Sequence, residues 1–441
     1  MKTQIEIPVA QIKSALPGLS KIIPRSSTLP VLACIKVAVS DDGSTTILQA
    51  HNLDEIATFT IGNSSPVAPG QMLVPAGTLT NLIKGCPADG VIQLINEGER
   101  TSVRYPVAGS MVERQLNHVA VKEWPEVKQI HGEPIELDVA FKQALKEALD
   151  SASTDSSRYV LNGACLDVRG SDGHYIIGTD GRHLYSANSF RFNLPEPLVV
   201  RSHKFVVWPG FMNDGPWKLR MHGAIRPKAG DTKVKEEGPW LEISSDHWTY
   251  TAKAIEGNYP NWKQVMPVDT SKWTRLVLAP EAIQAMQTAL PTLPGSELTN
   301  KTVTMDVTRS GLTLRARGNQ DEQDTVISIP DVRVTGDPVQ IALNRVYLLK
   351  ALKCGLSDLR IENSLSPLVF TSPSKTMIIM PVRLEAPAPP AKAAEAPAQA
   401  ASPAPVPEPQ TNVPPASPSA DEEVHFKTES AERKNDMSQE T

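Results

Sequence analysis

The segment GTDGRHLYSAN (residues 178–188) gathers an acid, a cation and an imidazole within four positions, at Asp180, Arg182 and His183. An aspartate beside a histidine is the pairing that orients an imidazole for general acid–base catalysis. A nucleophilic mechanism also needs a reactive group beside the histidine, and Thr179 is a poor nucleophile without a second base. The segment therefore has two interpretations: a hydrolase site using Asp180 and His183, or a pocket wall without chemistry.

The remaining sequence offers little support for catalysis, because it holds no phosphate-binding glycine loop, nucleophile elbow or zinc-protease motif. Its nine histidines are scattered, and no two are paired at metal-ligand spacing. Four isolated cysteines, without a CxxC pair, predict free buried thiols in a reducing cytoplasm: Cys34, Cys86, Cys165 and Cys354. We expect no metal, no cofactor, no signal peptide and no membrane segment.

The chain has 441 residues, more than one hydrophobic core usually holds, so we expect several domains. Its net charge of −5 is unevenly spread: residues 385–441 carry 10 acidic and 4 basic side chains, whereas residues 1–384 carry 39 and 40. After Leu384 the sequence is rich in proline and alanine, which predicts an extended, disordered tail. The tail either has no partner, or it competes with partner peptides or recruits a partner, because tethering raises its effective concentration.

A strand followed by an amphipathic helix recurs three times, with starts at Ile5, Ile135 and Leu276. In the middle copy, apolar residues 141, 144, 145, 148 and 149 share one helix face, and Pro8 and Pro280 stand where helices would open. Each third also holds a weaker second copy of the strand and helix, starting at Met72, Leu198 and Val339.

Between the two copies, each third has a hairpin whose turn glycine supplies positive φ, at Gly43, Gly173 and Gly311. The sequence therefore predicts an α+β fold of three structurally similar domains, each with antiparallel sheets and two helices on one face. We place the domains at residues 1–130, 131–272 and 273–384, followed by the tail at 385–441. After the second hairpin strand all three copies hold polar residues, which favours a structural role for the 178–188 segment.

Basic residues follow the exposed faces of the predicted helices. Such a run is either a solvated surface or a sequence-independent surface for the phosphates of nucleic acid. The residues are Lys13, Lys21, Lys142, Lys146, Lys204, Arg345, Lys350 and Lys353.

Over residues 1–384 the chain resembles the bacterial DNA polymerase III beta subunit, the replicative sliding clamp. The resemblance is strongest in RSSTLPVLACIKV (25–37), SRYVLNGACLDV (157–168), TDGRHL (179–184), EGNYPNWKQVMP (256–267) and MPVRL (380–384). It implies clamp domains with sheets outside and helices inside, and a homodimer that closes head-to-tail around double-stranded DNA. It implies a non-catalytic processivity factor of DNA replication that holds the polymerase near the primer end.

The resemblance also implies a cleft between the second and third domains, where partner proteins insert a short peptide with apolar and aromatic anchors. The implied partners are the DNA polymerase III alpha subunit, the clamp loader and other proteins with a clamp-binding motif. By matching residues, the cleft comprises Leu161, Thr179, Gly181, Arg182, His183, Leu184, Pro260, Val265, Leu356, Met380, Pro381, Val382, Arg383 and Leu384.

For DNA, Arg25 and Tyr159 match family positions that touch the duplex, and we add Lys13, Lys142 and Lys204 from the helix faces. At the subunit boundary, VRYPV (103–107) resembles the edge strand of the first domain. There Tyr105 and Val107 would pack near Ile283 and Met286 of the second copy.

Several positions depart from the family pattern. Arg182 and His183 stand in reversed order, Val160 replaces an aromatic residue, Gln264 replaces an arginine, and Trp262 replaces a smaller aromatic residue. These changes leave the peptide preference and one DNA contact open. An insertion at 222–240, interpreted as an extended hairpin tip, has no assigned role. A clamp paralogue that serves repair or a mobile-element polymerase is the alternative function, and a hydrolase the more distant one.

The substitution His183→Ala separates the clamp from the hydrolase. A clamp should lose affinity for partner peptides and keep its dimeric ring, whereas a hydrolase should lose turnover. Peptide titration together with sedimentation measures both properties of the clamp. Unchanged peptide binding by the variant would contradict the cleft assignment.

Overall fold

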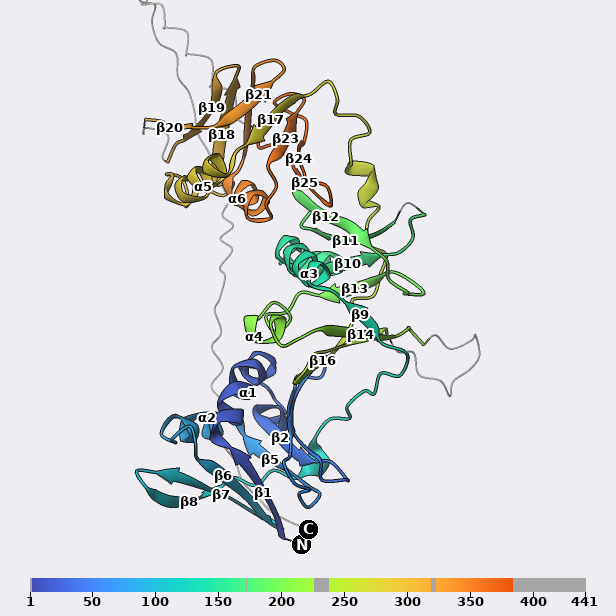
Figure 1. The fold of residues 1–441 in the computed structure, drawn as a ribbon, viewed down its shortest axis with the longest axis vertical. Coiled ribbons are helices and arrows are strands. Elements are labelled where there is room, and N and C mark those ends of the chain that lie inside the picture. Colours follow the sequence, from blue (N-terminus) through green and yellow to red (C-terminus); the bar gives the residue numbers. More distant parts are fainter. Residues whose placement is uncertain (1, 172, 226–237, 319–322, 384–441) are drawn as a thin grey trace, which may run out of the picture. The chain divides into compact units, whose positions relative to one another are not determined.

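Antiparallel strand pairing builds most of the chain, which is shown as a computed structural model in Figure 1. The structure describes residues 2–171, 173–225, 238–318 and 323–383. Residues 1–384 form one unit of internal contacts and residues 385–441 another. The predicted tail, Leu384 and most of the 222–240 insertion lie outside the described residues.

The N-terminal sheet has the strand order β1 (Lys2–Pro8), β6 (Val91–Glu97), β7 (Arg100–Val107) and β8 (Ser110–Leu116). In β1 the side chains alternate, because Ile5 and Ile7 are buried while Glu6 between them is exposed. The sheet therefore has one face on the core and one in solvent.

An eight-stranded sheet joins the first third of the chain to the second. Its order is β5 (Gly70–Pro75), β2 (Cys34–Val39), β3 (Thr45–His51), β4 (Glu55–Gly62), β16 (Trp248–Lys253), β15 (Trp240–Ser244), β14 (Trp217–His222) and β9 (Ile135–Leu137). At the β4–β16 junction Phe59 lies opposite Trp248, with ring centroids 4.8 Å apart. Buried Glu55 accepts a hydrogen bond of 2.5 Å from the Tyr250 hydroxyl across the same junction.

A nine-stranded sheet joins the second third to the last. Its order is β13 (Leu198–Arg201), β10 (Gly163–Asp167), β11 (His174–Thr179), β12 (His183–Phe190), β25 (Lys375–Ile379), β24 (Leu368–Thr371), β23 (Asp358–Ile361), β17 (Thr274–Leu278) and β21 (Val332–Thr335). The junction is the β12–β25 pair. Beside it, buried Glu147 accepts hydrogen bonds from the Tyr185 hydroxyl (2.5 Å) and the Lys375 Nζ (2.9 Å).

The last sheet has the order β20 (Thr325–Ile329), β19 (Gly311–Ala316), β18 (Thr302–Thr308) and β22 (Val339–Asn344). Like the N-terminal sheet it has four strands, and the third predicted hairpin forms its centre. Gly43, Gly173 and Gly311 all have positive φ, of 71°, 141° and 142°, which confirms the three predicted turns.

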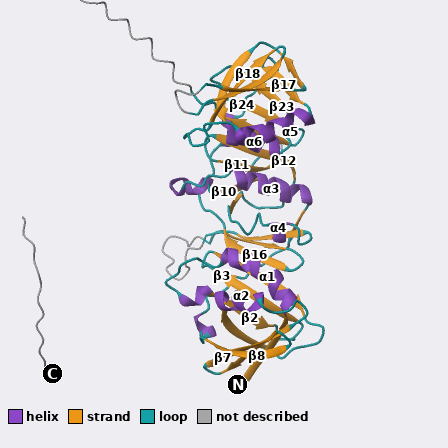
Figure 2. Cartoon of the chain, turned by 90° about the vertical axis from the view of Figure 1, so that its left-hand side faces the viewer, coloured by secondary structure: helices purple, strands orange, loops and turns teal. Residues whose placement is uncertain are grey.

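The helices are α1 (Val9–Ile22), α2 (Ala76–Lys84), α3 (Val139–Ser151), α4 (Pro209–Met212), α5 (Pro280–Ala289) and α6 (Arg345–Lys353), drawn in purple in Figure 2. Helix α1 contacts α2, and α5 contacts α6. Pro280 is the first residue of α5, as predicted, and Pro8 precedes the first residue of α1.

The second helix predicted for the middle third is reduced to the single turn of α4. The strand expected there is present as β13, but residues 202–208 do not form a helix. β-Branched and aromatic side chains at Val206, Val207 and Trp208 lose rotamer freedom in a helix, and a proline follows them. The periodic pattern there reflects burial rather than helix.

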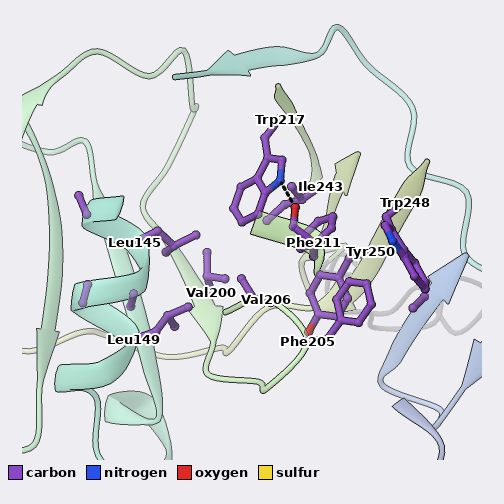
Figure 3. Packing of buried hydrophobic residues seen from close by; sticks show 14 of the residues in the cluster. Leu145, Leu149, Val200, Phe205, Val206, Phe211, Trp217, Ile243, Trp248 and Tyr250 are labelled. Carbon is purple, nitrogen blue, oxygen red and sulfur yellow. Dashed lines mark hydrogen bonds between the residues drawn. The ribbon is translucent and has the colours of Figure 1, made fainter. Parts of the chain in front are cut away.

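Aromatic packing fills the core beside α4. Figure 3 shows Phe205, Phe211, Trp217 and Tyr250 in contact, and the Trp217 indole N–H donates to the Phe211 carbonyl oxygen at 3.2 Å. All four side chains are fully buried, so their apolar surface is removed from water. The Trp217 indole N–H, which is buried with them, keeps a hydrogen-bond partner.

The four cysteines are free, and three of them are buried, while Cys354 is partly exposed. Burial raises the pKa of the Cys34 thiol to about 11 and that of Cys165 to about 12, which keeps both protonated and unreactive at neutral pH. Among the described helices, none has the length and apolar character needed to cross a bilayer.

We predict opposite effects of alanine at two glycines. A Cβ on Gly178 in β11 would stand 1.9 Å from the Ala148 carbonyl oxygen of α3, so Gly178→Ala should destabilise the protein by about 1–3 kcal/mol or more. A Cβ on Gly77 in α2 meets open space, so Gly77→Ala should stabilise it by about 0.5–1 kcal/mol. Denaturant unfolding measures both, and equal stability of the two variants would contradict the close α3–β11 packing.

Candidate functional site

The residues 179–183 form a tight turn between β11 and β12. Gly181 has a φ of 85°, which favours glycine. The Thr179 hydroxyl donates to the His183 carbonyl oxygen at 2.6 Å and accepts from the Gly181 N–H at 3.0 Å. Asp180 Oδ1 accepts from the N–H groups of Arg182 (2.8 Å) and His183 (3.0 Å). The polar side chains that the sequence brings together here close the turn on itself.

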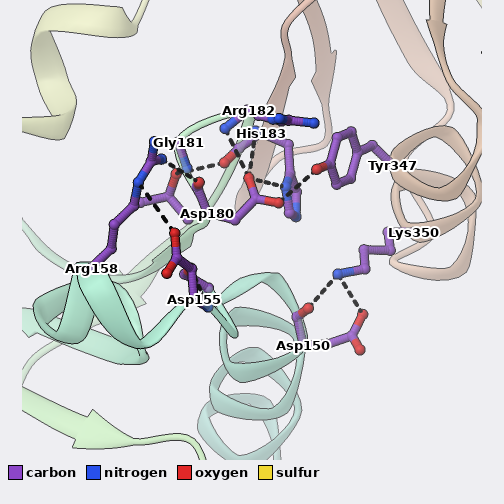
Figure 4. Close-up of polar contacts among 11 residues, drawn as sticks. Asp150, Asp155, Arg158, Asp180, Gly181, Arg182, His183, Tyr347 and Lys350 are labelled. Carbon is purple, nitrogen blue, oxygen red and sulfur yellow. Dashed lines mark hydrogen bonds and ion pairs between the residues drawn. The ribbon is translucent and has the colours of Figure 1, made fainter. Parts of the chain in front are cut away.

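Asp180 also connects this turn to helix α6. Its Oδ1 lies 2.8 Å from His183 Nδ1, and its Oδ2 accepts a hydrogen bond of 2.7 Å from the Tyr347 hydroxyl (Figure 4). The His183 and Tyr347 rings stack with centroids 4.2 Å apart. Burial acts to raise the pKa of Asp180, but the hydrogen bonds and charge of His183 and the Tyr347 hydroxyl outweigh it, so the pKa falls well below its usual value.

The geometry favours a structural role for the Asp180–His183 pair. The His183 side chain has no exposed surface, and among the described residues its Nε2 atom has no hydrogen-bond partner. An imidazole that transfers a proton to a substrate must reach it, directly or through one water. The pair therefore supports Tyr347 from behind, and the hydrolase interpretation has no geometric support.

A groove of about 340 Å³ opens on the other side of Tyr347. Backbone bonds hold its walls together: the Met380 N–H donates to the Arg182 carbonyl oxygen at 2.9 Å, and the Val382 N–H donates to the Ala342 carbonyl oxygen at 2.7 Å. We call it the Arg182 groove; its lining is Arg182, Asn300, Asn344, Tyr347, Met380, Pro381, Val382 and Arg383.

Five of the predicted cleft residues line this groove, namely Arg182, Met380, Pro381, Val382 and Arg383. Asn300, Asn344 and Tyr347 were not predicted. Asn344 is the N-cap of α6 and accepts from the Val346 N–H at 2.9 Å, so a helix-start signal before the Tyr347 turn could have drawn attention to both.

A second group of the predicted residues belongs to an apolar cluster beside β11 and β12. Buried Leu184 packs in this cluster with Trp262, and Leu161 is partly buried against it. Pro260 and Val265, which lie close to Trp262 in the sequence, are exposed. Thr179 is buried in the 179–183 turn. Leu356 is fully buried, so the structure places it in the core rather than on a cleft surface.

Trp262, where the family has a smaller aromatic residue, is held by a polar anchor. Its indole N–H donates to Asp167 Oδ2 at 2.9 Å, and its ring lies 4.9 Å from that of Tyr175. Burial acts to raise the pKa of Asp167, but hydrogen bonds from Arg169 and Trp262 lower it to about 2. The larger ring therefore fits without leaving a buried donor unpaired.

The predicted DNA-contacting residues separate into exposed and buried ones. Arg25, Lys13 and Lys204 are exposed, and Tyr159, in a short 3-10 helix (Ser156–Leu161), is 60 % exposed. The prediction that Lys142 contacts DNA is wrong. The residue is 7 % exposed, and its Nζ donates to the Met212 (3.1 Å) and Gly215 carbonyl oxygens. Its ammonium group caps the α4 turn and is not available to phosphate.

Arg345 is also internal, because its guanidinium is buried and donates to the Leu293 and Lys301 carbonyl oxygens. The burial of Lys142 and Arg345 could not be predicted from their helical positions, because the carbonyl groups that accept from their side chains belong to segments distant in sequence.

The residues predicted at the subunit boundary lie at both ends of the described fold. Tyr105 and Val107 of β7 are partly exposed, as is Ile283, whereas Met286 is fully buried behind the α5 surface. The expectation that 103–107 is an edge strand is wrong, because β8 pairs along the outer side of β7 and is itself the end strand of the sheet.

We predict that Asp180→Asn makes stability less dependent on acid pH. The wild-type carboxylate has a lowered folded-state pKa, so its contribution is present above about pH 4, the unfolded value, and is lost as the pH falls toward the folded one. The variant should be less stable at neutral pH, and the difference should narrow below about pH 4. Denaturant unfolding across pH measures this.

Tyr347→Phe is the matched control, because it keeps the carboxylate and the ring and removes one hydroxyl. It should retain most of the acid dependence of the wild type, because Asp180 keeps its bonds to His183 and to the N–H groups of Arg182 and His183. Parallel stability curves for Asp180→Asn and wild type would contradict the assigned network.

Comparison with known proteins agrees with this architecture. Residues 3–127 match the family model described as DNA polymerase III beta subunit, N-terminal domain. The beta sliding clamp of Escherichia coli K12 is 25% identical over 387 residues, covering 86% of this chain and 97% of that protein. The beta sliding clamp of Salmonella typhimurium is 24% identical over 388 residues, with the same coverage.

Solved structures show the same fold. The beta subunit of the Streptococcus pyogenes DNA polymerase aligns with a TM-score of 0.73 at 19% identity, over 87% of this chain and 100% of that one. The C. crescentus beta sliding clamp aligns with a TM-score of 0.73 at 20% identity, over 87% of this chain and 99% of that one. These alignments confirm the predicted clamp fold, and the family match over residues 3–127 and the relatives show that the chain is similar to the beta sliding clamps.

Proposed function

We propose that the chain is a DNA sliding clamp, a non-catalytic processivity factor that encircles duplex DNA and tethers the replicative DNA polymerase III. The observation that carries the proposal is the way neighbouring thirds are joined. The β4–β16 and β12–β25 pairs each continue a sheet from one third into the next. Two such junctions in each chain leave one junction to be made with a second copy.

The described end strands supply that third junction. β8 is the end strand of one four-stranded sheet, and β20 is the end strand of the other. Pairing β8 of one copy with β20 of the next would give an eight-stranded sheet, close in size to the eight- and nine-stranded sheets inside the chain. Head-to-tail pairing at both boundaries closes a ring of six domains, with residues 1–130, 131–272 and 273–384 as the three in each chain.

Exposed apolar side chains on these strands suit such a boundary. Met111 and Val112 of β8 are 56 % and 37 % exposed, and Val326 of β20 is 53 % exposed. Tyr105 lies opposite Val112, so its proposed place at the boundary is one strand inside the edge. Ile283 remains a proposed boundary contact, with Met286 supporting it from the core.

DNA would be held without base recognition. Arg25, Tyr159, Lys13 and Lys204 are the proposed contacts, since their side chains are exposed. Contacts of this kind release counterions and weaken steeply with salt, so retention must come from the closed ring rather than from affinity. A replicative clamp would act in the cytoplasm, where bacterial DNA lies.

The Arg182 groove and the apolar cluster next to it are the proposed docking site for partner peptides. Partners of this kind include the DNA polymerase III alpha subunit, the clamp loader and other proteins with the clamp-binding motif. A clamp paralogue for repair or for a mobile-element polymerase would share the ring and the groove, and identification of the polymerase partner separates the two.

Retention on DNA of different topology tests the proposal. Clamp assembled on a nicked circular plasmid should stay bound during gel filtration and should be lost after the plasmid is cut once. Val112→Glu should weaken the boundary and the retention, because it buries a charge without a partner. Leu365→Glu, at an exposed apolar position in the β23–β24 turn, is the matched control and should behave as wild type. Equal loss from circular and linear DNA would refute the ring.

A further inference from the structure

A pocket of about 520 Å³ lies in the middle third of the chain, where the nine-stranded and eight-stranded sheets approach each other. We call it the Arg201 pocket; the polar side chains of its lining include Tyr159, Asn162, Arg201, Trp240, Lys253 and Glu256. Its lining and that of the Arg182 groove have no residue in common, so the two are separate sites.

One wall of the pocket is the edge of the nine-stranded sheet. Strand β13 is an end strand of that sheet, and its last residue, Arg201, lies opposite Gly163 of β10. One position further on, the Ser202 N–H donates to the Asn162 carbonyl oxygen at 2.9 Å. The pairing of these two strands therefore brings Arg201 and Asn162 to the same pocket.

The other wall comes from the eight-stranded sheet. Trp240 of β15 lies opposite Lys253 of β16, and the Lys253 Nζ stands 5.6 Å from the centroid of the indole ring. The same ammonium group pairs with Asp54 Oδ1 at 2.7 Å. Just after β16, the Ile255 N–H donates to the Val199 carbonyl oxygen of β13 at 3.0 Å, so a backbone hydrogen bond joins the two walls.

Three residues of the lining carry a buried polar atom that has no hydrogen-bond partner among the described residues. These atoms are Asn162 Oδ1, Arg201 Nε and Trp240 Nε1, and Trp240 as a whole is 6 % exposed. Buried polar atoms in native proteins are nearly always hydrogen-bonded, so three unpaired ones around one pocket need an explanation. Because none of the three makes a hydrogen bond, turning toward a ligand would break none.

The chemistry of the lining limits what such a ligand can be. The side chains of Arg201, Trp240 and Lys253 donate hydrogen bonds and cannot accept them. The ligand must therefore supply acceptors, and the charges of Arg201 and Lys253 favour acceptors that are negatively charged. The NH₂ group of the Asn162 amide and the Tyr159 hydroxyl can donate to the same ligand.

A phosphate ester fits these donors better than a carboxylate does. It offers three acceptor oxygens to donors that come from separate walls, whereas a carboxylate offers two oxygens in one plane. The pocket is also larger than a phosphate group alone and lies within the size range of small-molecule sites. The Tyr159 ring, which is 60 % exposed, is available to stack on a base.

Glu256 is the acidic side chain of the lining. Its Oε1 lies close to Gly238, because a Cβ on that glycine would stand 1.9 Å from it. Among the described residues it makes no ion pair with Arg201, whose Nε has no hydrogen-bond partner. The Arg201 charge is therefore left for a ligand, and Glu256 opposes an anion from one side of the pocket.

We propose that the Arg201 pocket binds a small phosphate monoester of about mononucleotide size. Arg201 holds two phosphate oxygens through its paired N–H groups, Trp240 and Asn162 donate to the third oxygen, and Tyr159 covers the organic part. The inference depends neither on peptide docking nor on closure of the ring, because it rests on the lining of this pocket alone.

Isothermal titration calorimetry on the full-length protein, in a chloride buffer without phosphate, tests the proposal. The probes are deoxyadenosine 5′-monophosphate (dAMP) and deoxyadenosine, which differ only in the phosphate group. We expect dAMP to bind at least about tenfold more tightly than deoxyadenosine, the ratio produced by charge-assisted hydrogen bonds to the phosphate. Inorganic phosphate should displace dAMP.

Variants assign the binding to this pocket. Arg201→Gln should weaken dAMP binding about tenfold, and Arg201→Lys should weaken it less, because the charge remains and the paired N–H geometry is lost. Glu256→Gln should strengthen binding about threefold, because it removes a like charge. Arg309→Gln removes an exposed guanidinium from the β18–β19 turn and should bind as wild type. Thermal unfolding without ligand reports whether each fold is intact.

Each alternative result overturns a stated part of the inference. Equal binding of dAMP and deoxyadenosine overturns phosphate recognition, and undiminished binding by Arg201→Gln overturns the assignment to this pocket. A ten-nucleotide single strand that displaces dAMP and binds far more tightly would reassign the pocket to a DNA strand. Failure of the wild type to bind dAMP overturns the inference and leaves ring closure, which retention on circular DNA tests, unaffected.

Discussion

Strand pairing across the thirds of the chain is the constraint on which the other features depend. Each junction combines backbone hydrogen bonds with a buried carboxylate that accepts a hydrogen bond from the other side: Glu55 accepts from the Tyr250 hydroxyl at one junction, and Glu147 accepts from Lys375 Nζ at the other. A one-residue slip in register would turn every side chain of the strand to the opposite face and leave these buried groups unpaired. The polar pairs thus fix the register that the apolar contacts stabilise.

The Arg182 groove follows from the second junction. Arg182 and Met380 belong to opposite sides of it, and a backbone hydrogen bond joins them. Tyr347 then bridges from α6 to Asp180. Residue types associated with catalysis serve here to hold an aromatic wall in place, because the imidazole that could move a proton is sealed behind that wall.

The sequence was informative wherever a feature depends on local pattern. Glycine turns, strand alternation and the amphipathic face of α3 are each set by neighbours in the chain, and they are found as predicted. Features that depend on distant segments were not predictable in this way. Lys142 was assigned to an exposed helix face, but carbonyl groups from around α4 surround its ammonium group. Residues 103–107 were assigned to the edge of the sheet, but β8 pairs outside them.

The groove shows the same division. The MPVRL segment and the TDGRHL turn were found through family resemblance, and the structure places Arg182 and Met380 side by side. Asn300 and Tyr347 reach the groove from separate segments of the last third, and only the folded arrangement shows that they meet there. The charge that the groove presents could be stated only from the structure, which shows that Arg182 is exposed and that its neighbour His183 is buried.

The two internal junctions have a mechanical consequence. Neighbouring thirds of the chain are linked by continuous backbone, by strand pairing and by buried polar groups, so separating them would break all of these at once. In the proposed assembly the seam between copies has no covalent link. Admission of DNA would therefore cost least by separating the two chains at that seam, because no strand pairing within a chain has to break.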